Sequence, residues 1–526
     1  MAMDPALQER LMAAAPYGMG VAVHAEEAPE RMAVLSKYGG RTLGELNANA
    51  NRLARVLRAH GVGPDTGVAL LCRNRPEFID TVAACSRSGA RMTPINWHIS
   101  PPEVAYIVAN CEARVLIADV AFAPAVAAAQ AESSHLRLTL AVGGEIESAE
   151  SYDEALAAQD GSDIDNPILG SPMLYTSGTT GHPKGVYRKA DATPTPFLLA
   201  VRESGDFEPD TDCSLVTGPL YHAAPLGLNL SMPMGAGVGS VLMDKWDAEE
   251  TLALIDKHRV THTHMVATMF HRMLSLPREV RDRYNVSSMR WLMHGAAPTP
   301  VHIKHKIIEW FGPVVWEYYA ATEGGTFLVD SSEWLKKPGS VGRTVEGTKY
   351  KVLDDDGEPV PAGTTGTVYF AAAENRFVYF KAPDKTDAAY RDDFFTMGDM
   401  GYVDEDGYLF LTGRSAETII AGGVNIYPQE IDDVLQQHPA VYEVCTVGVP
   451  HEEWGESVKS VVEVDEDYEA GDELAEELLV WCRENLPDFK RPRSIDFATD
   501  LPRMPTGKIQ RGLVRAPYWK GRERAI

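Results

Sequence analysis

The sequence predicts an α/β fold: a large N-terminal domain of two α/β subdomains and a β-barrel-like subdomain, followed by a small α+β C-terminal domain. Three observations lead to this prediction. Strand and helix patterns alternate between Arg41 and Gly295, short strands separated by turns follow up to Leu411, and a compact mixed pattern begins after Arg414. Alternating strands and helices are typical of a parallel sheet with helices on both faces.

Length and composition narrow the class of protein. At about 150 residues per domain, 526 residues correspond to three or four domain-sized units. Hydrophobic residues make up 44% and charged residues 24%, which is ordinary globular composition and excludes disorder as the main state. The six cysteines form no C-x-x-C pair and are expected to be reduced thiols. With no signal-peptide pattern and no apolar run of membrane-helix length, we expect a cytoplasmic protein without a transmembrane segment.

The first α/β subdomain is expected at about residues 1–170. Thr42–His60 has apolar residues at helical spacing, and Gly67–Cys72 is a short apolar run typical of a buried strand. Pro76–Gly89 is helical again, with a proline suited to the first turn. Arg114–Ala118 predicts a further strand, so this region alternates as a parallel α/β unit does.

The rest of the chain is expected in three further parts. The second α/β subdomain, at 171–338, has strand candidates at Gly239–Met243, Thr261–Ala267 and Met289–Met293. The turns D-D-G, A-G-T-T-G and D-E-D-G then separate short strands, which predicts an all-β subdomain at 339–413. After a short connection at 414–416, the C-terminal domain is expected at 417–526.

The net charge of the chain limits the classes of molecule that it is expected to bind. With 49 basic and 75 acidic residues the sum is −26, which disfavours nucleic acid because phosphate backbones need a basic face. The charge is uneven, since Ser415–Phe489 holds 2 basic and 19 acidic residues whereas Lys490–Ile526 holds 10 basic and 3 acidic ones. A basic end on an acidic protein is suited to attract a small polyphosphate.

A glycine-rich segment at Leu174–Val186 (LYTSGTTGHPKGV) predicts a phosphate-binding loop. Glycines let backbone N–H groups crowd an anion, hydroxyls add donors, and a lysine supplies a positive charge. The segment is not a Walker loop, because Lys184 is followed by Gly185 and not by Ser or Thr. The alternative interpretation of this segment is a flexible linker without a binding role. The candidate phosphate-binding residues are Thr176, Ser177, Gly178, Thr179, Thr180 and Lys184.

This loop resembles the signature of the adenylate-forming superfamily, which includes acyl-CoA synthetases, peptide-synthetase adenylation domains and beetle luciferases. Four further segments agree in order and spacing: Tyr319–Gly324 (YAATEG), Phe395–Gly401 (FTMGDMG), Gly413–Pro428 (GRSAETIIAGGVNIYP) and Pro505–Arg511 (PTGKIQR). The resemblance covers essentially the whole chain. It implies a two-step reaction that uses ATP, Mg²⁺ and coenzyme A. A carboxylate attacks the α-phosphate of ATP, giving an acyl-adenylate and pyrophosphate, and a thiol then releases AMP.

The resemblance also implies roles for individual residues. Thr176–Lys184 would cover the β- and γ-phosphates, Thr322 would donate to the α-phosphate, and Glu323 would hold Mg²⁺. Asp399, at a predicted turn, would accept the ribose hydroxyls with Arg414 beside it. Lys508 would balance the negative charge as the carboxylate and the α-phosphate meet. Taken alone, Thr322 and Glu323 also fit the start of a helix, with Thr322 as its N-cap.

Other candidates surround the nucleotide and the acid. Gly295, Ala296 and Ala297 follow a predicted strand, and residues this small would let a flat ring approach the backbone, so they are expected to line the adenine and acyl pockets. Tyr319 would stack on the adenine, with a buried core aromatic as the alternative. His222 would gate the acyl site by resemblance, with an ordinary core histidine as the rival. No histidine spacing indicates zinc.

The resemblance further implies that the C-terminal domain is mobile and swings about 414–416 between the two steps. Gly422 and Gly423 would then border the pantetheine tunnel of coenzyme A. Two positions depart from the common pattern: Ala416 at the pivot, and Ala320 where a glycine is usual. Either the variation is tolerated, or one half-reaction is altered.

The leading prediction is an acyl-CoA ligase for an apolar, bulky carboxylic acid. The alternatives are an enzyme that mainly thioesterifies an adenylate made by an upstream enzyme, one that loads a carrier protein, and a non-catalytic nucleotide-binding protein. Oligomeric state stays open, a homodimer included. Methionines fill irregular apolar shapes, although they are more often plain core residues. The methionines expected near the acid are Met232, Met234, Met265 and Met269.

Overall fold

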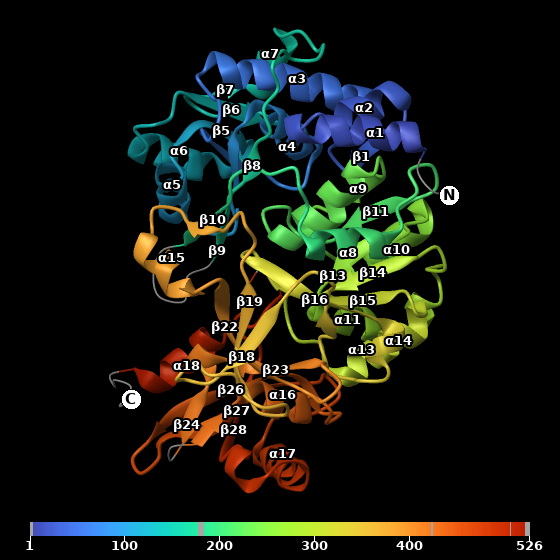
Figure 1. Cartoon of the computed structure of the whole chain (residues 1–526). Coiled ribbons are helices and arrows are strands. Elements are labelled where there is room, and N and C mark those ends of the chain that lie inside the picture. Colours follow the sequence, from blue (N-terminus) through green and yellow to red (C-terminus); the bar gives the residue numbers. More distant parts are fainter. Residues whose placement is uncertain (1–3, 177–182, 422–423, 505–506, 521–526) are drawn as a thin grey trace.

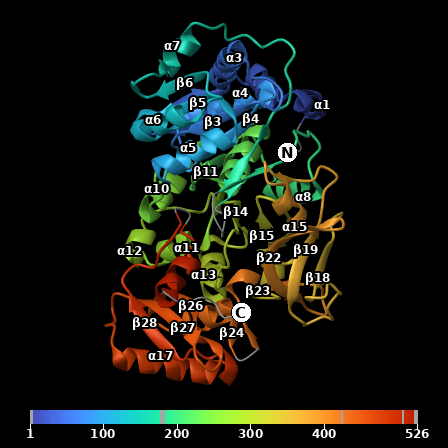
Figure 2. The same ribbon diagram turned by 90° about the vertical axis from the view of Figure 1, so that its left-hand side faces the viewer.

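The computed structural model describes residues 4–176, 183–421, 424–504 and 507–520. Figures 1 and 2 show two α/β layers in blue and green, an orange β-rich region below them, and an orange-to-red C-terminal region at the far end. The predicted fold class, a mixed α/β protein with a large N-terminal and a smaller C-terminal domain, is confirmed. No helix in the described part of the chain is long and apolar enough to cross a membrane.

The first sheet is parallel and has six strands. In spatial order these are β7 (Glu150–Ser151), β6 (Leu138–Val142), β5 (Ala113–Asp119), β3 (Gly67–Leu71), β4 (Arg91–Pro94) and β8 (Ser171–Pro172). The helices of this region are α1 (Pro5–Ala14), α2 (Gly20–Glu27), α3 (Leu43–Ala59), α4 (Pro76–Ser88), α5 (Pro101–Asn110), α6 (Ala123–Glu132) and α7 (Tyr152–Ala157). The two predicted helices and two predicted strands of this region are confirmed. Helix α3 begins where predicted because Thr42 and Glu45 form a capping box.

The second sheet has nine strands. In spatial order these are β17 (Arg343–Thr344), β16 (Gly324–Asp330), β15 (Val315–Ala321), β14 (Trp291–His294), β13 (His262–Met265), β11 (Cys213–Val216), β12 (Gly239–Leu242), β1 (Met32–Ser36) and β2 (Gly39–Thr42). Strand β1 pairs in parallel with β12, although it comes from the N-terminal end of the chain. The helices of this region are α8 (Pro196–Gly205), α9 (Met232–Gly235), α10 (Ala248–His258), α11 (Ala267–Leu274), α12 (Arg278–Arg281), α13 (Val301–Phe311) and α14 (Ser331–Trp334).

Two strand limits of this sheet differ from the prediction. The strand expected at Thr261–Ala267 ends at Met265, because Val266 is the N-cap of helix α11. The strand expected at Met289–Met293 runs from Trp291 to His294 instead. In the first case the apolar residues Val266 and Ala267 continue past the last paired residue, and in the second Met289 and Arg290 precede the first paired residue, Trp291. Hydrophobicity alone therefore does not show where pairing starts and stops.

The region predicted to be all-β contains a five-stranded sheet of β18 (Tyr350–Leu353), β19 (Gly366–Ala371), β22 (Phe394–Val403), β21 (Tyr390–Arg391) and β23 (Leu409–Arg414). It also contains a helix, α15 (Pro383–Ala389), so the all-β prediction was wrong in that detail. Strand β20 (Val378–Tyr379) of the same region is not part of this sheet. It pairs with β10 (Lys184–Tyr187), which in turn pairs with β9 (Leu174–Thr176). This small sheet links the β-rich region to the predicted phosphate loop.

The C-terminal sheet consists of β25 (Val424–Ile426), β24 (Ile419–Ala421), β27 (Gly455–Val464), β26 (Val441–His451) and β28 (Ser494–Ala498). Its helices are α16 (Pro428–Leu435), α17 (Asp472–Asn485) and α18 (Arg511–Arg515). Its core packs Ile431, Leu435, Val462 and Leu478 together. The predicted α+β character of this region is therefore confirmed.

Candidate active site

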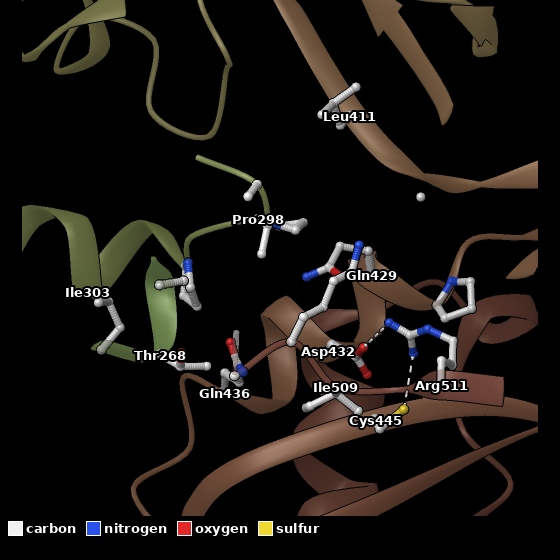
Figure 3. Close-up of a pocket in the computed structure, with 18 of the residues that line it drawn as sticks. Thr268, Pro298, Ile303, Leu411, Gln429, Asp432, Gln436, Cys445, Ile509 and Arg511 are labelled. Atoms are coloured by element: carbon white, nitrogen blue, oxygen red, sulfur yellow. Dashed lines mark hydrogen bonds and ion pairs between the residues drawn. The ribbon is translucent and has the colours of Figure 1, made fainter. Parts of the chain in front are cut away.

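Two cavities lie side by side where the large sheet, the β-rich region and the C-terminal region meet. The larger has a volume of about 890 Å³ and the smaller about 250 Å³. The residues that line both are Ala296, Tyr318, Ala320, Ala321, Arg414 and Lys508. In the close-up of the smaller cavity, Thr268, Pro298 and Ile303 lie on one side, and Gln429, Asp432 and Gln436 of the C-terminal region on the other (Figure 3).

The predicted phosphate loop connects the two strands of a hairpin. Strands β9 and β10 are antiparallel, and Thr176 pairs directly with Lys184. Both residues line the large cavity, whereas Ser177, Gly178, Thr179 and Thr180 lie outside the described residues. The Lys184 ammonium lies 5.0 Å from the centre of the Tyr379 ring. Burial lowers the pKa of Lys184, and the nearby Lys385 charge adds to that effect.

Thr322 and Glu323 line the same cavity. They form the turn between β15 and β16, because Ala321 pairs with Gly324 across the hairpin, and they do not start a helix. The Tyr379 hydroxyl donates to Glu323 Oε1 at 2.9 Å. Tyr379 thus contacts the lysine of one hairpin and the carboxylate of the other.

Asp399 is held by two donors. It lies within strand β22, not at a turn as predicted, and pairs with Arg414 of β23. Arg414 Nε donates to Oδ1 at 2.9 Å, and the Tyr319 hydroxyl donates to Oδ2 at 2.7 Å. Burial and the Asp399 charge raise the pKa of Tyr319 well above its usual range, so Tyr319 stays a donor. The Tyr319 ring is buried against Phe327 and Phe370, and it lines the small cavity.

Lys508 reaches the wall between the two cavities from the C-terminal region. Burial lowers its pKa, and the Arg414 guanidinium lowers it further, whereas Glu417 and Asp399 act in the opposite direction. Lys508 is thus partly buried between the two cavities and differs from a fully exposed surface lysine. The structure therefore brings residues from three distant segments of the sequence to one cavity: Thr176 and Lys184, Glu323, and Lys508.

The segment after β14 separates the cavities. Ala296 lines both cavities, and Ala297 lines the small one. A side chain at Gly295 would place its Cβ 2.6 Å from the Tyr318 ring, so only glycine fits there. Gly295 itself lines neither cavity, and the expected contacts of these three residues with the nucleotide and the acid stay a prediction.

His222 lines the large cavity, and its Nε2 atom is buried with no hydrogen-bond partner among the described residues. Burial lowers the pKa of His222 to about 4, so its imidazole is neutral near pH 7. The ring lies 4.5 Å from that of Tyr221. His222 thus faces the cavity and also packs against a neighbouring aromatic, and either predicted role fits.

Comparisons with known proteins agree with this geometry. The sequence model described as AMP-binding enzyme matches residues 21–376, and that described as AMP-binding enzyme C-terminal domain matches residues 430–508. The chain belongs to the AMP-binding enzyme family. The predicted adenylate-forming enzyme of the acyl-CoA synthetase type is confirmed, and membership implies ATP and CoA as substrates.

Named relatives of this AMP-binding enzyme cover nearly all of its length. It is 34% identical over 486 residues to a feruloyl-CoA synthase of Amycolatopsis sp (92% of this chain, 95% of that protein). It is 30% identical over 519 residues to the fatty acid–[acyl-carrier-protein] ligase ScoC of Streptomyces coeruleorubidus (96% of each chain). Among solved structures it resembles the anthranilate CoA ligase AuaEII in complex with anthranoyl-AMP. That match has a TM-score of 0.86 and 25% identity, and covers 96% of this chain and 97% of that one.

The far wall of the large cavity of this AMP-binding enzyme is mainly apolar. Of the four predicted methionines, Met232 and Met269 line it, whereas Met265 is buried in the core and Met234 packs against a core cluster. The other apolar lining residues there include Phe197, Leu198, Leu228 and Val266. This composition suits an acid with a largely apolar skeleton.

Sequence reasoning missed several lining residues. Arg202, an exposed residue of α8, lines the large cavity, and no hydrogen bond or ion pair of its side chain is found in the described part of the chain. Tyr379, Tyr318 and His264 were missed as well. Tyr318 directly precedes the YAATEG segment but is not part of it, His264 lies in no motif, and only strand pairing brings Tyr379 of β20 to the phosphate hairpin.

Of the two departures from the family pattern, Ala320 has a local explanation. Ala320 pairs with Gly325 across the β15–β16 hairpin, and a Cβ at Gly325 would lie 2.2 Å from that of Ala320. Because residue 325 is a glycine, the methyl group of Ala320 fits between the two strands. Ala416 is exposed on a short turn of helix at Ser415–Glu417. Gly422 and Gly423 lie outside the described residues.

Proposed function

We propose that this enzyme joins an apolar carboxylic acid to coenzyme A in two steps and releases pyrophosphate and AMP. The observation that carries the proposal is the position of Lys508 on the wall shared by both cavities. In the smaller cavity, Asp399 and Arg414 are suited to a nucleoside. The larger cavity combines phosphate-type residues at one end with apolar walls at the other.

In the first step, the acid's carboxylate attacks the α-phosphate of ATP, so that two anionic groups must meet. Lys508 supplies positive charge at that point, and the Thr322 hydroxyl donates to an α-phosphate oxygen. Lys184 and the hydroxyls of the hairpin loop bind the β- and γ-phosphates, which leave as pyrophosphate. Each group acts by position and charge, as phosphoryl-type chemistry requires.

Glu323 is the residue that would hold Mg²⁺. No group of three or more His, Cys, Asp or Glu suited to a metal occurs among the described residues. One carboxylate beside a phosphate site fits Mg²⁺ nonetheless, because this ion is commonly bound by one or two carboxylates together with substrate phosphates. When bound, the ion would neutralise charge on the leaving phosphates. The hydrogen bond from Tyr379 orients Glu323 toward this role.

Asp399 is the proposed acceptor for the ribose hydroxyls. Its oxygens already accept one bond each from Arg414 and Tyr319, and a carboxylate has about four lone-pair sites, so capacity remains. Gly295, Ala296 and Ala297 would lie against the adenine and the start of the acyl group. The bond to Asp399 supports Tyr319 as an anchor of this carboxylate.

In the second step, the thiol of coenzyme A attacks the acyl carbon and AMP leaves. Because Lys508 occupies the meeting point of the cavities, we propose that the C-terminal domain turns about 414–416 before the thiol enters. Gly422 and Gly423 would then border the pantetheine. A carrier-protein acceptor is the second candidate, since the relative ScoC is named for that acceptor.

We further propose that the enzyme carries out both half-reactions itself and is located in the cytoplasm. The glycine opposite Ala320 argues against a lost first half-reaction, and so against dependence on an upstream adenylating enzyme. The six cysteines are free thiols, which agrees with the proposed cytoplasmic location. A homodimer remains a proposal for solution measurement.

The test is an assay of the purified protein with ATP, Mg²⁺ and a panel of carboxylic acids, with and without coenzyme A. Mass spectrometry follows AMP and the thioester. We expect a CoA-dependent thioester in equal amount to AMP. AMP binding without turnover of any acid would support the non-catalytic alternative. Thioester formed only from synthetic acyl-adenylates would show that adenylation has been lost.

A further inference from the structure

Two buried polar residues that line the large cavity, His264 and Tyr318, contact each other beside its apolar walls. His264 lies on β13 and Tyr318 on β15, and His264 Nε2 and the Tyr318 hydroxyl are 3.1 Å apart. Both side chains are buried, and both residues line the cavity. The surrounding walls are aromatic and aliphatic, with the Phe197 and Tyr318 rings 6.5 Å apart.

Gly295 makes this contact across strands feasible. Strand β14 lies between β13 and β15, and His294 of β14 pairs with Glu317, so Gly295 follows beside Tyr318. The Tyr318 ring passes so close to Gly295 that a Cβ there would be 2.6 Å from the ring. The ring thus reaches past β14 to His264. Side chains alternate along a strand, and the next residue, Tyr319, bonds Asp399 instead.

The pair has hydrogen-bonding capacity left over. Burial lowers the pKa of His264 to about 3, so the imidazole is neutral and carries one N–H. A neutral histidine and a tyrosine hold two donor hydrogens, and their mutual bond uses one of them. The Tyr318 oxygen also keeps a free lone pair. No other partner for the Tyr318 hydroxyl is found among the described residues. The pair is therefore able to donate one further bond and to accept one, as a hydroxyl group needs.

The distance along the strand sets the position of that group in the acid. On strand β15, Tyr318 comes three residues before Ala321, which adjoins Thr322. At about 3.3 Å per residue, the distance along the strand between Tyr318 and Ala321 is roughly 10 Å. The carboxylate of the acid reacts near Thr322 and Lys508. A group of the same acid that contacts Tyr318 is therefore separated from the carboxylate by about the length of an aromatic ring and a short spacer. A hydroxyl buried among apolar walls without a partner would be strongly disfavoured, and this pair supplies the partner.

We propose that the substrate is an aryl carboxylic acid whose ring carries a phenolic hydroxyl, and that His264 and Tyr318 select it by binding that hydroxyl. This inference rests on the proposed ligase function and specifies its substrate class. Arg202, exposed at the same cavity, provides the rival, which is an acid with a second carboxylate.

The experiment compares kcat/KM for 4-hydroxycinnamate, cinnamate and adipate in CoA-dependent AMP release. We expect the wild-type enzyme to prefer 4-hydroxycinnamate to cinnamate by about tenfold or more, which one well-placed hydrogen bond supplies. Tyr318→Phe keeps the ring against Gly295 and should lower the ratio to about one while cinnamate is still used. Tyr152→Phe is the matched control, because it removes a buried hydroxyl that lines neither cavity.

Three results would overturn the inference while leaving the ligase in place. These are equal use of the two cinnamates, a preference that persists in Tyr318→Phe, and better use of adipate, which would assign selection to Arg202. Turnover of fatty acids alone would overturn it as well. Absence of thioester from every acid, including the apolar panel, would instead contradict the proposed ligase function itself.

Discussion

The surroundings of Lys508 differ from those of an exposed lysine. Burial and the Arg414 charge lower its pKa from the usual 10.5, so it loses its proton at a lower pH than an exposed lysine does. Below that pKa it is charged and suited to adenylation. The adenylation rate should therefore be level near neutrality and fall as the pH rises through the lowered pKa.

The check is a pH profile of pyrophosphate release without coenzyme A, for the wild type and for Lys508→Arg. Arginine stays charged throughout this range, so the variant should be slower but lack the alkaline fall. If both proteins show the same fall, another group is responsible and Lys508 does not carry the charge.

Tyr379 contacts both sides of the phosphate end. Its hydroxyl donates to Glu323, so Tyr379→Phe leaves the ring under Lys184 and removes only the orienting bond. We expect the concentration of Mg²⁺ that gives half-maximal adenylation to rise by about tenfold, which is typical when a partner of a metal-binding group is lost. Tyr390→Phe removes a nearby hydroxyl bonded to the Phe377 carbonyl and serves as the control. An unchanged Mg²⁺ requirement in Tyr379→Phe would contradict the assignment of Glu323.

At the scale of elements, the β15–β16 hairpin positions Thr322 and Glu323. Because Ala320 faces Gly325, Gly325→Ala should crowd the hairpin and lower the free energy of unfolding by about 1–3 kcal/mol. The double variant Ala320→Gly/Gly325→Ala exchanges the two side chains and should recover most of that loss. Denaturant unfolding and the adenylation rate measure both effects. Failure of the double variant to recover would show that the two positions do not compensate each other.

Helix α11 of the large N-terminal domain contacts strand β26 of the C-terminal region at the small cavity. The His271 ring lies 4.8 Å from that of Tyr442, and His271 Nδ1 is 3.9 Å from Glu443 Oε1. This contact belongs to the orientation that brings Lys508 to the cavities. His271→Ala should therefore slow adenylation several-fold and leave thioester formation from a synthetic acyl-adenylate unchanged. The exposed His135→Ala is the control, and equal slowing of both steps would contradict the assignment.

The sequence pattern predicted the elements whose signals are local. Helix α3 has its capping box and apolar stripe in one stretch, and α4 begins at the predicted proline. Strand β20 and helix α15 were missed, because two residues of pairing or two turns of helix in a polar segment have no strong periodicity. The turn predicted at Asp399, which follows Gly398, was wrong, because Asp399 lies in the middle of strand β22.

Across the whole molecule, the motifs were predictable and their meeting place was not. Glu323, Asp399 and Lys508 each lie in a recognisable segment, but only the assembled sheets show that Lys508 reaches the wall between two cavities. Residues without motifs, such as His264, Tyr379 and Arg202, reach the same site through long-range packing. A single sequence holds no local signal for such contacts.

The most direct test of the account is to separate the two half-reactions in Lys508→Ala. Pyrophosphate release from ATP and the acid reports the first step, and thioester formation from a synthetic acyl-adenylate and coenzyme A reports the second. We predict that the variant loses the first step by about a hundredfold or more and keeps the second near the wild-type rate. Equal loss of both steps, or an unaffected first step, would contradict the claim that Lys508 serves adenylation at the junction of the two cavities.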